Sequence, residues 1–145
     1  MTKTLSVLVL SLFTILTANA QKSDTLKRFA ADTLVFESVE QEPEFPGGMA
    51  AFYKFLEKNS RYPKQALFNK EQGRVIIQMV VEKDGTLTQI AVVRSVSPSL
   101  DQEAIRIIKL CPPWKAGMQN GRDVRVKYTV PITFKFEDKT HTQGF

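Results

Sequence analysis

An alternating stretch near the C-terminus constrains the fold of this chain more than any other part of the sequence. Between Val124 and Phe136, apolar residues occupy every even position, and polar residues or proline occupy every odd position. Successive side chains of a β-strand point to opposite faces, so this period predicts a strand with one buried face and one basic, solvated face. Burying each apolar side chain contributes roughly 1.5–3 kcal/mol, which is enough in sum to fix the register of the strand.

Pro131 indicates where this strand lies in its sheet. Proline has no N–H to donate to a neighbouring strand, so within a sheet it is confined to an edge strand or a bulge. We therefore expect an edge strand, protected by Lys and Pro, whose free flank can still accept another chain.

The first twenty residues have the features of a secretory signal. Lys3 supplies the positive start, residues 5–16 form an apolar run, and Ala18 and Ala20 give a small-x-small cleavage site. The rival interpretation is a retained membrane anchor, but the apolar run is shorter than the ~20 residues that a spanning helix needs. We expect cleavage after Ala20 and a soluble exported protein without stable membrane insertion.

Composition and rare residues exclude several classes of function. The chain carries a net charge of +5, yet its basic residues are scattered and no nucleic-acid motif accompanies them. It has one Cys, Cys111, and one His, His141, with no metal-ligand spacing, no nucleophile–base pair and no phosphate loop. We expect no enzyme activity, no metal, no cofactor and no nucleic-acid partner.

The remaining periodicities predict two helices and two further strands. Met49, Phe52, Tyr53 and Leu56 form one helical stripe that ends near Asn59. Val- and Ile-rich strands are expected over residues 74–82 and 87–96, joined by a tight turn at Asp84-Gly85. The main helix begins at Ser97-Pro98 or, through a capping box with Gln102, at Ser99.

These elements define a small α+β domain. We expect a three-stranded antiparallel sheet with two helices packed on one face, and residues 34–39 as a candidate short extra strand. Asp84 is assigned a turn-forming role rather than a catalytic one. Trp114 is expected to pack the connection over the sheet, and the alternative is that it faces a bound peptide.

An ordered set of residues resembles the TonB C-terminal domain family. The set runs through Tyr62-Pro63, Ala66, Gly73-Arg74-Val75, Val80-Val81, Asp84-Gly85, Val92-Val93-Arg94-Ser95, Leu100-Asp101, Ala104, Trp114-Lys115, Asn120-Gly121, Val126 and Val130-Pro131-Ile132-Thr133-Phe134. The upstream residues Val39-Glu40 and Pro43 to Gly48 look like the extension of its Bacteroidetes-type members.

The resemblance implies a periplasmic domain that binds the short TonB box peptide of outer-membrane transporters beside its last strand, and so contributes to transport and its energy transduction. This agrees with the edge strand expected from the residues themselves. The implied peptide-binding residues are Arg125, Val126, Lys127, Tyr128, Thr129, Val130, Pro131, Thr133 and Lys135, with Trp114 as a possible peptide-facing anchor.

The predicted organisation is a signal peptide (1–20), a polar leader (21–33), the domain (34–136) and a polar tail (137–145). Unlike full energy transducers, which resemble a membrane helix followed by a proline-rich spacer, this chain is expected to be a stand-alone member with neither. The alternative function is a structural or adaptor role, in which the same edge strand serves homodimerisation or assembly of an envelope complex.

Overall fold

Residues 35–136 carry the fold, which we describe from a computed structural model. The structure describes residues 29–30 and 32–136, so the expected signal peptide and polar tail lie outside the described residues. The chain divides between Leu34 and Val35 into two units. In the first unit, residues 29–30 and 32–33 are helical, and the Thr33 hydroxyl donates to the Phe29 carbonyl at 2.9 Å.

The second unit is organised around a sheet with the strand order β1-β5-β2-β3. Its long members are β2 (Gly73–Val81), β3 (Leu87–Arg94) and β5 (Arg122–Phe134), and β2 pairs antiparallel with both of the others. Two short strands, β1 (Val35–Phe36) and β4 (Gly117–Gln119), pair with the first part of β5. The alternating stretch of the sequence therefore forms a strand, as predicted, but this strand is not a sheet edge along its whole length, because β1 pairs with Arg125 and Val126 on the flank away from β2.

Two tight turns connect the strands, namely the predicted turn at Asp84-Gly85 and a second one at Asn120-Gly121. Gly85 has φ +82° in the β2–β3 turn, and the Asp84 carboxylate accepts hydrogen bonds from the N–H and hydroxyl of Thr86 at 3.0 and 2.7 Å. Asn120 and Gly121 have φ of +52° and +69° in the β4–β5 turn, which is the pair of positive angles that a type I′ hairpin requires. Asp84 thus has the turn-forming role expected from the sequence.

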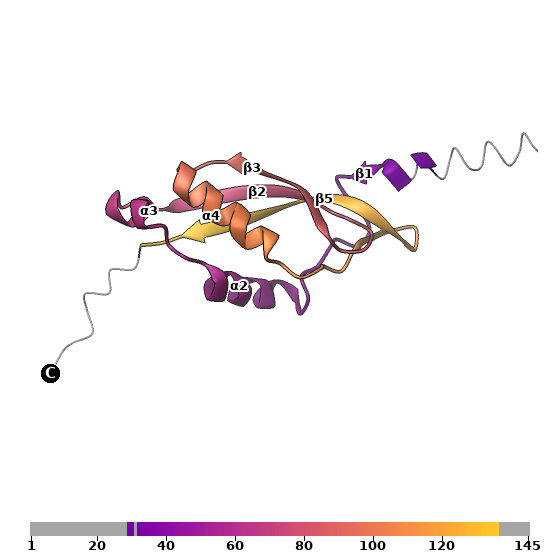
Figure 1. Ribbon diagram of the computed structural model, residues 1–145. Coiled ribbons are helices and arrows are strands. Elements are labelled where there is room, and N and C mark those ends of the chain that lie inside the picture. The colour runs from indigo at the N-terminus through magenta and orange to yellow at the C-terminus, as the bar shows by residue number, and fades with distance from the viewer. Residues whose placement is uncertain (1–28, 31, 137–145) are drawn as a thin grey trace, which may run out of the picture. The chain divides into compact units, whose positions relative to one another are not determined.

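Three helices accompany the sheet, namely α2 (Gly48–Asn59), α3 (Lys64–Phe68) and α4 (Pro98–Lys109). Ser97 caps α4 by accepting a hydrogen bond from the Leu100 N–H at 3.4 Å, so the earlier of the two expected starts is used. In Figure 1, α4 lies against the sheet and α2 runs along the β5 side, away from β3.

The core lies between the helices and one face of the sheet. It combines alternate residues of β2 and β5 with the inner residues of α2 and α4, including Val75, Ile77, Met79, Val130, Ile132, Phe52, Leu56, Leu100, Ala104, Ile107 and Ile108. The α+β class with helices on one face is therefore confirmed, and the candidate short strand within residues 34–39 is present as β1. The expected three-stranded antiparallel sheet with two helices is not exact. Residues 35–136 form five strands in a mixed sheet and three helices, because β4 and α3 are too short to give a strong periodic signal.

The segment before α2 is tied to the β4 region. Backbone hydrogen bonds join Gln41 to Met118 and Glu44 to Lys115 at 2.8–3.1 Å. The Glu40 carboxylate also accepts from the Gln119 side chain at 3.2 Å and from the Asn120 N–H at 3.3 Å. This segment thereby connects β1 to α2 across the base of β5.

Candidate functional site

The flank of β5 that faces away from β2 is only partly covered. On that flank β1 runs parallel to β5, with Val35 opposite Arg125 and Phe36 opposite Val126. The hairpin partner β4 pairs with Arg122–Val124. From Lys127 to Phe134, the described residues provide β5 with a strand partner on the β2 side alone. Eight residues of strand backbone, roughly 26 Å long, thus have one unpaired flank.

Pro131 defines which backbone groups face that flank. It lies opposite Ile76 of β2, and without an N–H it cannot donate to that strand. Backbone N–H groups alternate between the two flanks of a strand. An intact β2–β5 ladder therefore turns the N–H groups of Lys127, Thr129 and Thr133 away from β2, toward the open flank.

The predicted site residues divide into two sets by the direction of their side chains. Val126 and Val130 are buried in the protein interior, and Tyr128 is half-buried, so these three contribute backbone alone to the flank. Thr129, Thr133 and Lys135 are exposed, whereas Lys127 and Pro131 are half-buried. Lys135 follows the last residue of β5.

The first two residues of the predicted site already have a partner. Arg125 and Val126 are paired with β1, so a peptide added at this end of the predicted stretch would have to displace β1. The sequence did not predict this pairing, because a two-residue strand some ninety positions upstream leaves no periodic signal.

A groove of about 670 Å³ follows the open flank. One side is the end of β5, from Pro131 to Lys135, and the other is α2. The groove is lined by Tyr53, Leu56, Glu57, Ser60, Tyr62, Arg74, Pro131, Ile132, Thr133, Phe134 and Lys135. Its volume lies within the range of ~300–1,000 Å³ that is usual for ligand sites.

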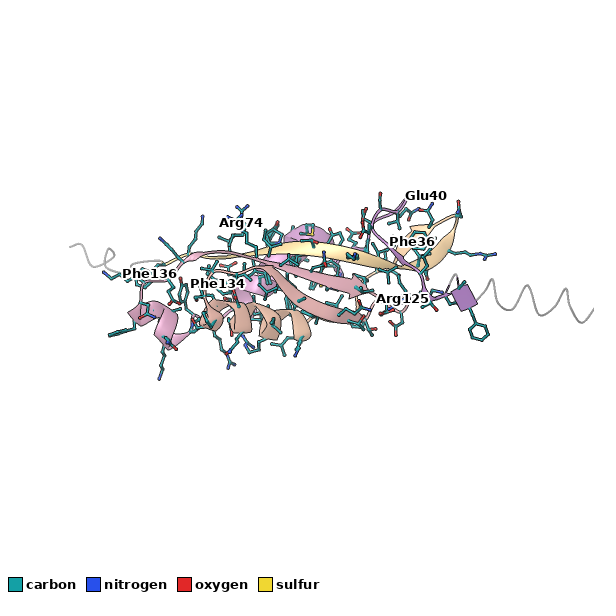
Figure 2. The ribbon with its side chains drawn as sticks, turned by 90° about the horizontal axis from the view of Figure 1, so that it is seen from above. Phe36, Glu40, Arg74, Arg125, Phe134 and Phe136 are labelled. Carbon is teal, nitrogen blue, oxygen red and sulfur yellow. The ribbon has the colours of Figure 1, made fainter. Side chains whose placement is uncertain are left out.

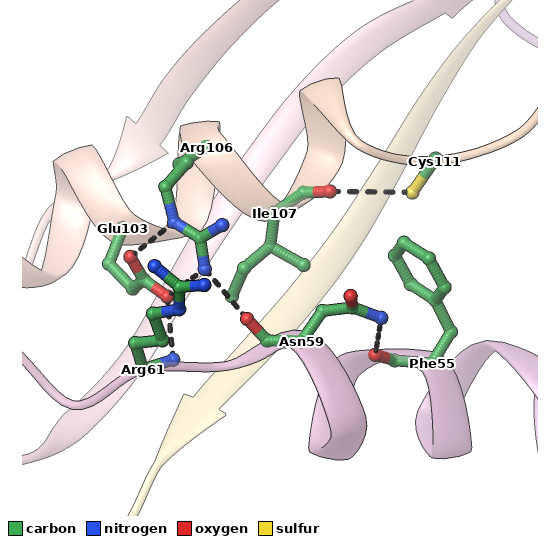
Figure 3. Close-up of polar contacts among 7 residues, drawn as sticks. All are labelled: Phe55, Asn59, Arg61, Glu103, Arg106, Ile107 and Cys111. Atoms are coloured by element: carbon green, nitrogen blue, oxygen red, sulfur yellow. Dashed lines mark hydrogen bonds and ion pairs between the residues drawn. The ribbon is translucent and has the colours of Figure 1, made fainter.

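The α2 wall is held by a polar network at the end of that helix (Figure 3). The buried Glu103 carboxylate of α4 accepts hydrogen bonds from the Arg61 N–H at 2.7 Å and from the Arg106 guanidinium at 2.6 and 2.8 Å. Arg106 in turn donates to the Asn59 carbonyl at 2.6 Å. Burial raises the pKa of Glu103, but hydrogen bonds from Arg106 and Arg61 outweigh it and leave the pKa below its usual value.

Tyr62 closes the groove at the end of β5. Its ring lies edge-on to Phe134 and Phe136, with centroids 6.1 and 6.3 Å away, and its hydroxyl donates to the Glu71 carbonyl. Such aromatic pairs are favourable beyond their area alone, so the ring is fixed rather than free to fill the groove.

Two ion pairs stabilise the covered end of β5. Arg125 donates to the Glu82 carboxylate at 2.6 and 3.0 Å, and Lys127 donates to Glu37 at 2.6 Å. The hydrogen bond from Arg125 lowers the pKa of Glu82, with burial opposing it, and the bond from Lys127 lowers the pKa of Glu37. The second pair joins the residue after β1 to the first residue of the unpaired stretch.

Trp114 lies away from the groove. Its side chain is 3% exposed and packs edge-on against Phe45, Phe52 and Tyr128, with ring centroids 5.3–5.8 Å apart. This position fits the expectation that Trp114 packs the connection over the sheet. It does not fit the alternative that Trp114 faces a bound peptide, because core side chains enclose the ring.

Tyr53 was not predicted as a site residue. The sequence places it in the apolar stripe of α2, yet 53% of its surface is exposed and it lines the groove. The apolar stripe of α2 is wider than the face with which this helix packs on the core. That excess width is the signal that could have identified Tyr53. Glu57 and Arg74 carry no comparable signal, since exposed charges are common everywhere.

Other kinds of site are not supported in the described part of the chain. No group of three or more His, Cys, Asp or Glu residues there could hold a metal ion. Cys111 is half-buried, and its thiol donates to the Ile107 carbonyl at 3.7 Å. Among the same residues, no helix has the length and apolar character to cross a membrane.

The fold and the groove define a small α+β domain with a partly unpaired strand beside a helix. Residues 58–136 match the family model of the Gram-negative bacterial TonB protein C-terminal domain, which covers more than half of the chain. The chain therefore belongs to the TonB C-terminal domain family.

Two solved structures of a related protein are similar to the chain. Both are NMR solution structures of the Helicobacter pylori TonB C-terminal domain. The first shares 25% identity, covers 60% of this chain and 91% of its own, and has a TM-score of 0.44. The second shares 22% identity, covers 61% and 82% respectively, and has a TM-score of 0.43. Among curated proteins there is no significant match.

Proposed function

We propose that this protein binds the TonB box of outer-membrane transporters in the periplasm, by adding that peptide as a strand to β5. Membership in the TonB C-terminal domain family supports a TonB-like role. The single observation that carries the proposal is the unpaired flank of Lys127–Phe134, which opens into the groove beside α2.

The binding mode follows from the geometry of the flank. Main-chain hydrogen bonds to the outward N–H and C=O groups of β5 supply affinity that does not depend on the peptide sequence. Alternate peptide side chains then face either the α2 wall, near Tyr53 and Leu56, or the open face of the sheet near Thr129 and Thr133. Selectivity arises from these two surfaces.

Proline substitution on β5 tests the proposal. Thr129→Pro removes one outward N–H, and Thr129→Val is the matched control, because it keeps that N–H and the branched shape at an exposed position. We expect synthetic TonB box peptides to bind the parent and Thr129→Val alike in calorimetric titrations. Thr129→Pro should bind at least tenfold more weakly, a loss of about one hydrogen bond.

Circular dichroism spectra and the midpoint of thermal unfolding test whether Thr129→Pro is folded. A folded Thr129→Pro that binds the peptides like the parent would refute strand addition at this flank. Sedimentation over a concentration series tests the use of the same flank for a homodimer, since self-pairing would weaken peptide binding as the protein concentration rises.

A further inference from the structure

Three cations, two on strands and one just after a strand, line a hollow at one corner of the sheet. Arg74 on β2, Arg94 at the end of β3 and Lys135 just after β5 are all exposed. Together with Gln72, Gly73, Thr133 and Phe134 they line a second hollow of about 390 Å³. Figure 2 shows Arg74 projecting from the face of the sheet that is opposite α4.

The strand register explains why these cations are close. Arg74 lies opposite Thr133 of β5, and Arg94 lies opposite Ile76, two residues along β2 from Arg74. Lys135 is two residues beyond Thr133, just after the end of β5, and lines the same hollow as Arg74 and Thr133. Arg74 is a diagonal neighbour of Arg94, at a separation of roughly 7–8 Å or somewhat less between Cβ atoms.

The charge at this corner is not neutralised by the rest of the described chain. Among the described residues, Arg74, Arg94 and Lys135 form no ion pair within 4.0 Å, in contrast to Arg106, Arg125 and Lys127. Glu57 lines the opposite wall of the peptide groove and is not paired with them either. Three like charges at such spacing repel one another, and an anion bound between them relieves that repulsion.

The corner is continuous with the peptide groove, because Arg74, Thr133, Phe134 and Lys135 line both hollows. If a peptide strand adds to β5, one of the peptide side chains lies next to Thr133, on the face of the sheet opposite α4. Thr133 is short, so the long Arg74 side chain can reach over it from β2, while Lys135 is adjacent on β5 itself.

We propose, on the basis of the strand-addition function above, that this corner selects peptides with an acidic residue at the end that lies beside Thr133 and Lys135. Arg74 and Lys135 contact the carboxylate, and Arg94 strengthens the positive potential from one strand further away. The partner is therefore an acidic peptide, with backbone pairing for affinity and this carboxylate for register and direction.

A double-mutant cycle tests the assignment. The probes are four capped seven-residue peptides of alternating Val and Thr. One has Glu at the N-terminal end, one has Glu at the C-terminal end, and each has a counterpart with Gln in place of that Glu. We expect one of the two Glu peptides to bind the parent roughly three- to tenfold more tightly than its Gln counterpart, as two exposed ion pairs would give. Which of the two Glu peptides binds more tightly than its Gln counterpart reports the direction of the added strand.

The protein variants are Arg74→Gln/Lys135→Gln and, as a matched control, Lys64→Gln/Lys70→Gln, which removes the same charge from exposed residues at and after α3. The preference for Glu over Gln should vanish in the first variant and persist in the second. It should also shrink when salt is raised from about 50 to about 500 mM.

The outcomes separate this inference from the function on which it rests. Suppose that Thr129→Pro weakens the binding of every peptide, but neither Glu peptide binds the parent more tightly than its Gln counterpart. The acidic selectivity is then wrong, and strand addition stands. A Glu preference that survives equally in both double variants also overturns it, because the attraction would then be a general effect of net charge. If no peptide binds the parent, strand addition itself fails.

Discussion

The carboxylate of Glu103 on α4 accepts a hydrogen bond from the backbone N–H of Arg61, 42 positions earlier in the chain, at 2.7 Å. Through Arg106 the same carboxylate is also linked to the last residue of α2. Because α2 is one wall of the groove, this contact makes the width of the groove depend on a residue that does not line it.

Glu103→Ala should therefore lower the stability of the domain. The substitution leaves the Arg61 N–H without its acceptor and leaves the Arg106 guanidinium with the Asn59 carbonyl alone, which costs about 1.5–3 kcal/mol for hydrogen bonds to a charged group. Glu103→Gln retains an oxygen acceptor and should lose roughly half as much. Urea unfolding followed by circular dichroism measures both, and an unchanged midpoint for Glu103→Ala would show that α2 is held by its apolar face alone.

Acid should destabilise the domain through Glu82. Its folded-state pKa lies below the ordinary 4.5 because Arg125 and Thr88 donate hydrogen bonds to it, against the opposing effect of burial. As the pH falls below about 4.5, the Glu82 carboxylate becomes protonated in the unfolded state while it is still ionised in the folded state. Its contribution to stability is therefore present at neutral pH and is lost on acidification.

The Glu82→Gln variant isolates that contribution. Urea midpoints measured between pH 7 and pH 3 should fall less steeply for Glu82→Gln than for the parent. Parallel curves for the two proteins would contradict a native-state role for the Glu82–Arg125 pair.

The sequence predicted β5 as a strand because its alternation is local, whereas its predicted edge position holds only beyond Val126, where β1 no longer pairs with it. The alternation from Val124 to Phe136 determines which side chains are buried, and Pro131 cannot donate to β2 wherever the strand lies. The turn at Asp84 was equally local. These features required no knowledge of which segments pack together.

The parts that were missed all arise from contacts between distant segments. The pairing of β1 with Arg125 and Val126 joins positions about ninety residues apart through two residues. The exposed side of Tyr53 depends on where α2 lies relative to β5. Arg74, Arg94 and Lys135 come together through the register of three strands, and a scattered set of charges in the sequence gives no sign of it.

Gly85 should be the least replaceable glycine of the two turns. It has φ +82°, and a Cβ there would lie 1.8 Å from the Trp114 carbonyl oxygen, so Ala would be strained and would also displace the connection that holds Trp114. Gly121 is the control, since it has φ +69° but no heavy atom within 4 Å of the added Cβ.

We expect Gly121→Ala to cost about 1–2 kcal/mol, the usual penalty of a left-handed residue with a side chain. Gly85→Ala should lower the free energy of unfolding by clearly more. It should also shift the Trp114 fluorescence, because the backbone N–H of Trp114 donates to the Gly85 carbonyl at 2.8 Å. Equal losses in thermal unfolding would mean that the turn relaxes to accept the methyl group.

Cys111 should be unreactive in the native protein. Burial raises the pKa of its thiol from 9.0 to about 11, although a contact with Trp114 partly opposes the shift. The thiolate is the reactive form, so at pH 8 the native thiol should react with iodoacetamide about 100-fold more slowly than the unfolded chain. Labelling followed by mass spectrometry, with and without urea, measures the ratio, and Cys111→Ser gives the background. Equal rates in the two states would show that the turn after α4 opens readily and exposes the thiol to solvent.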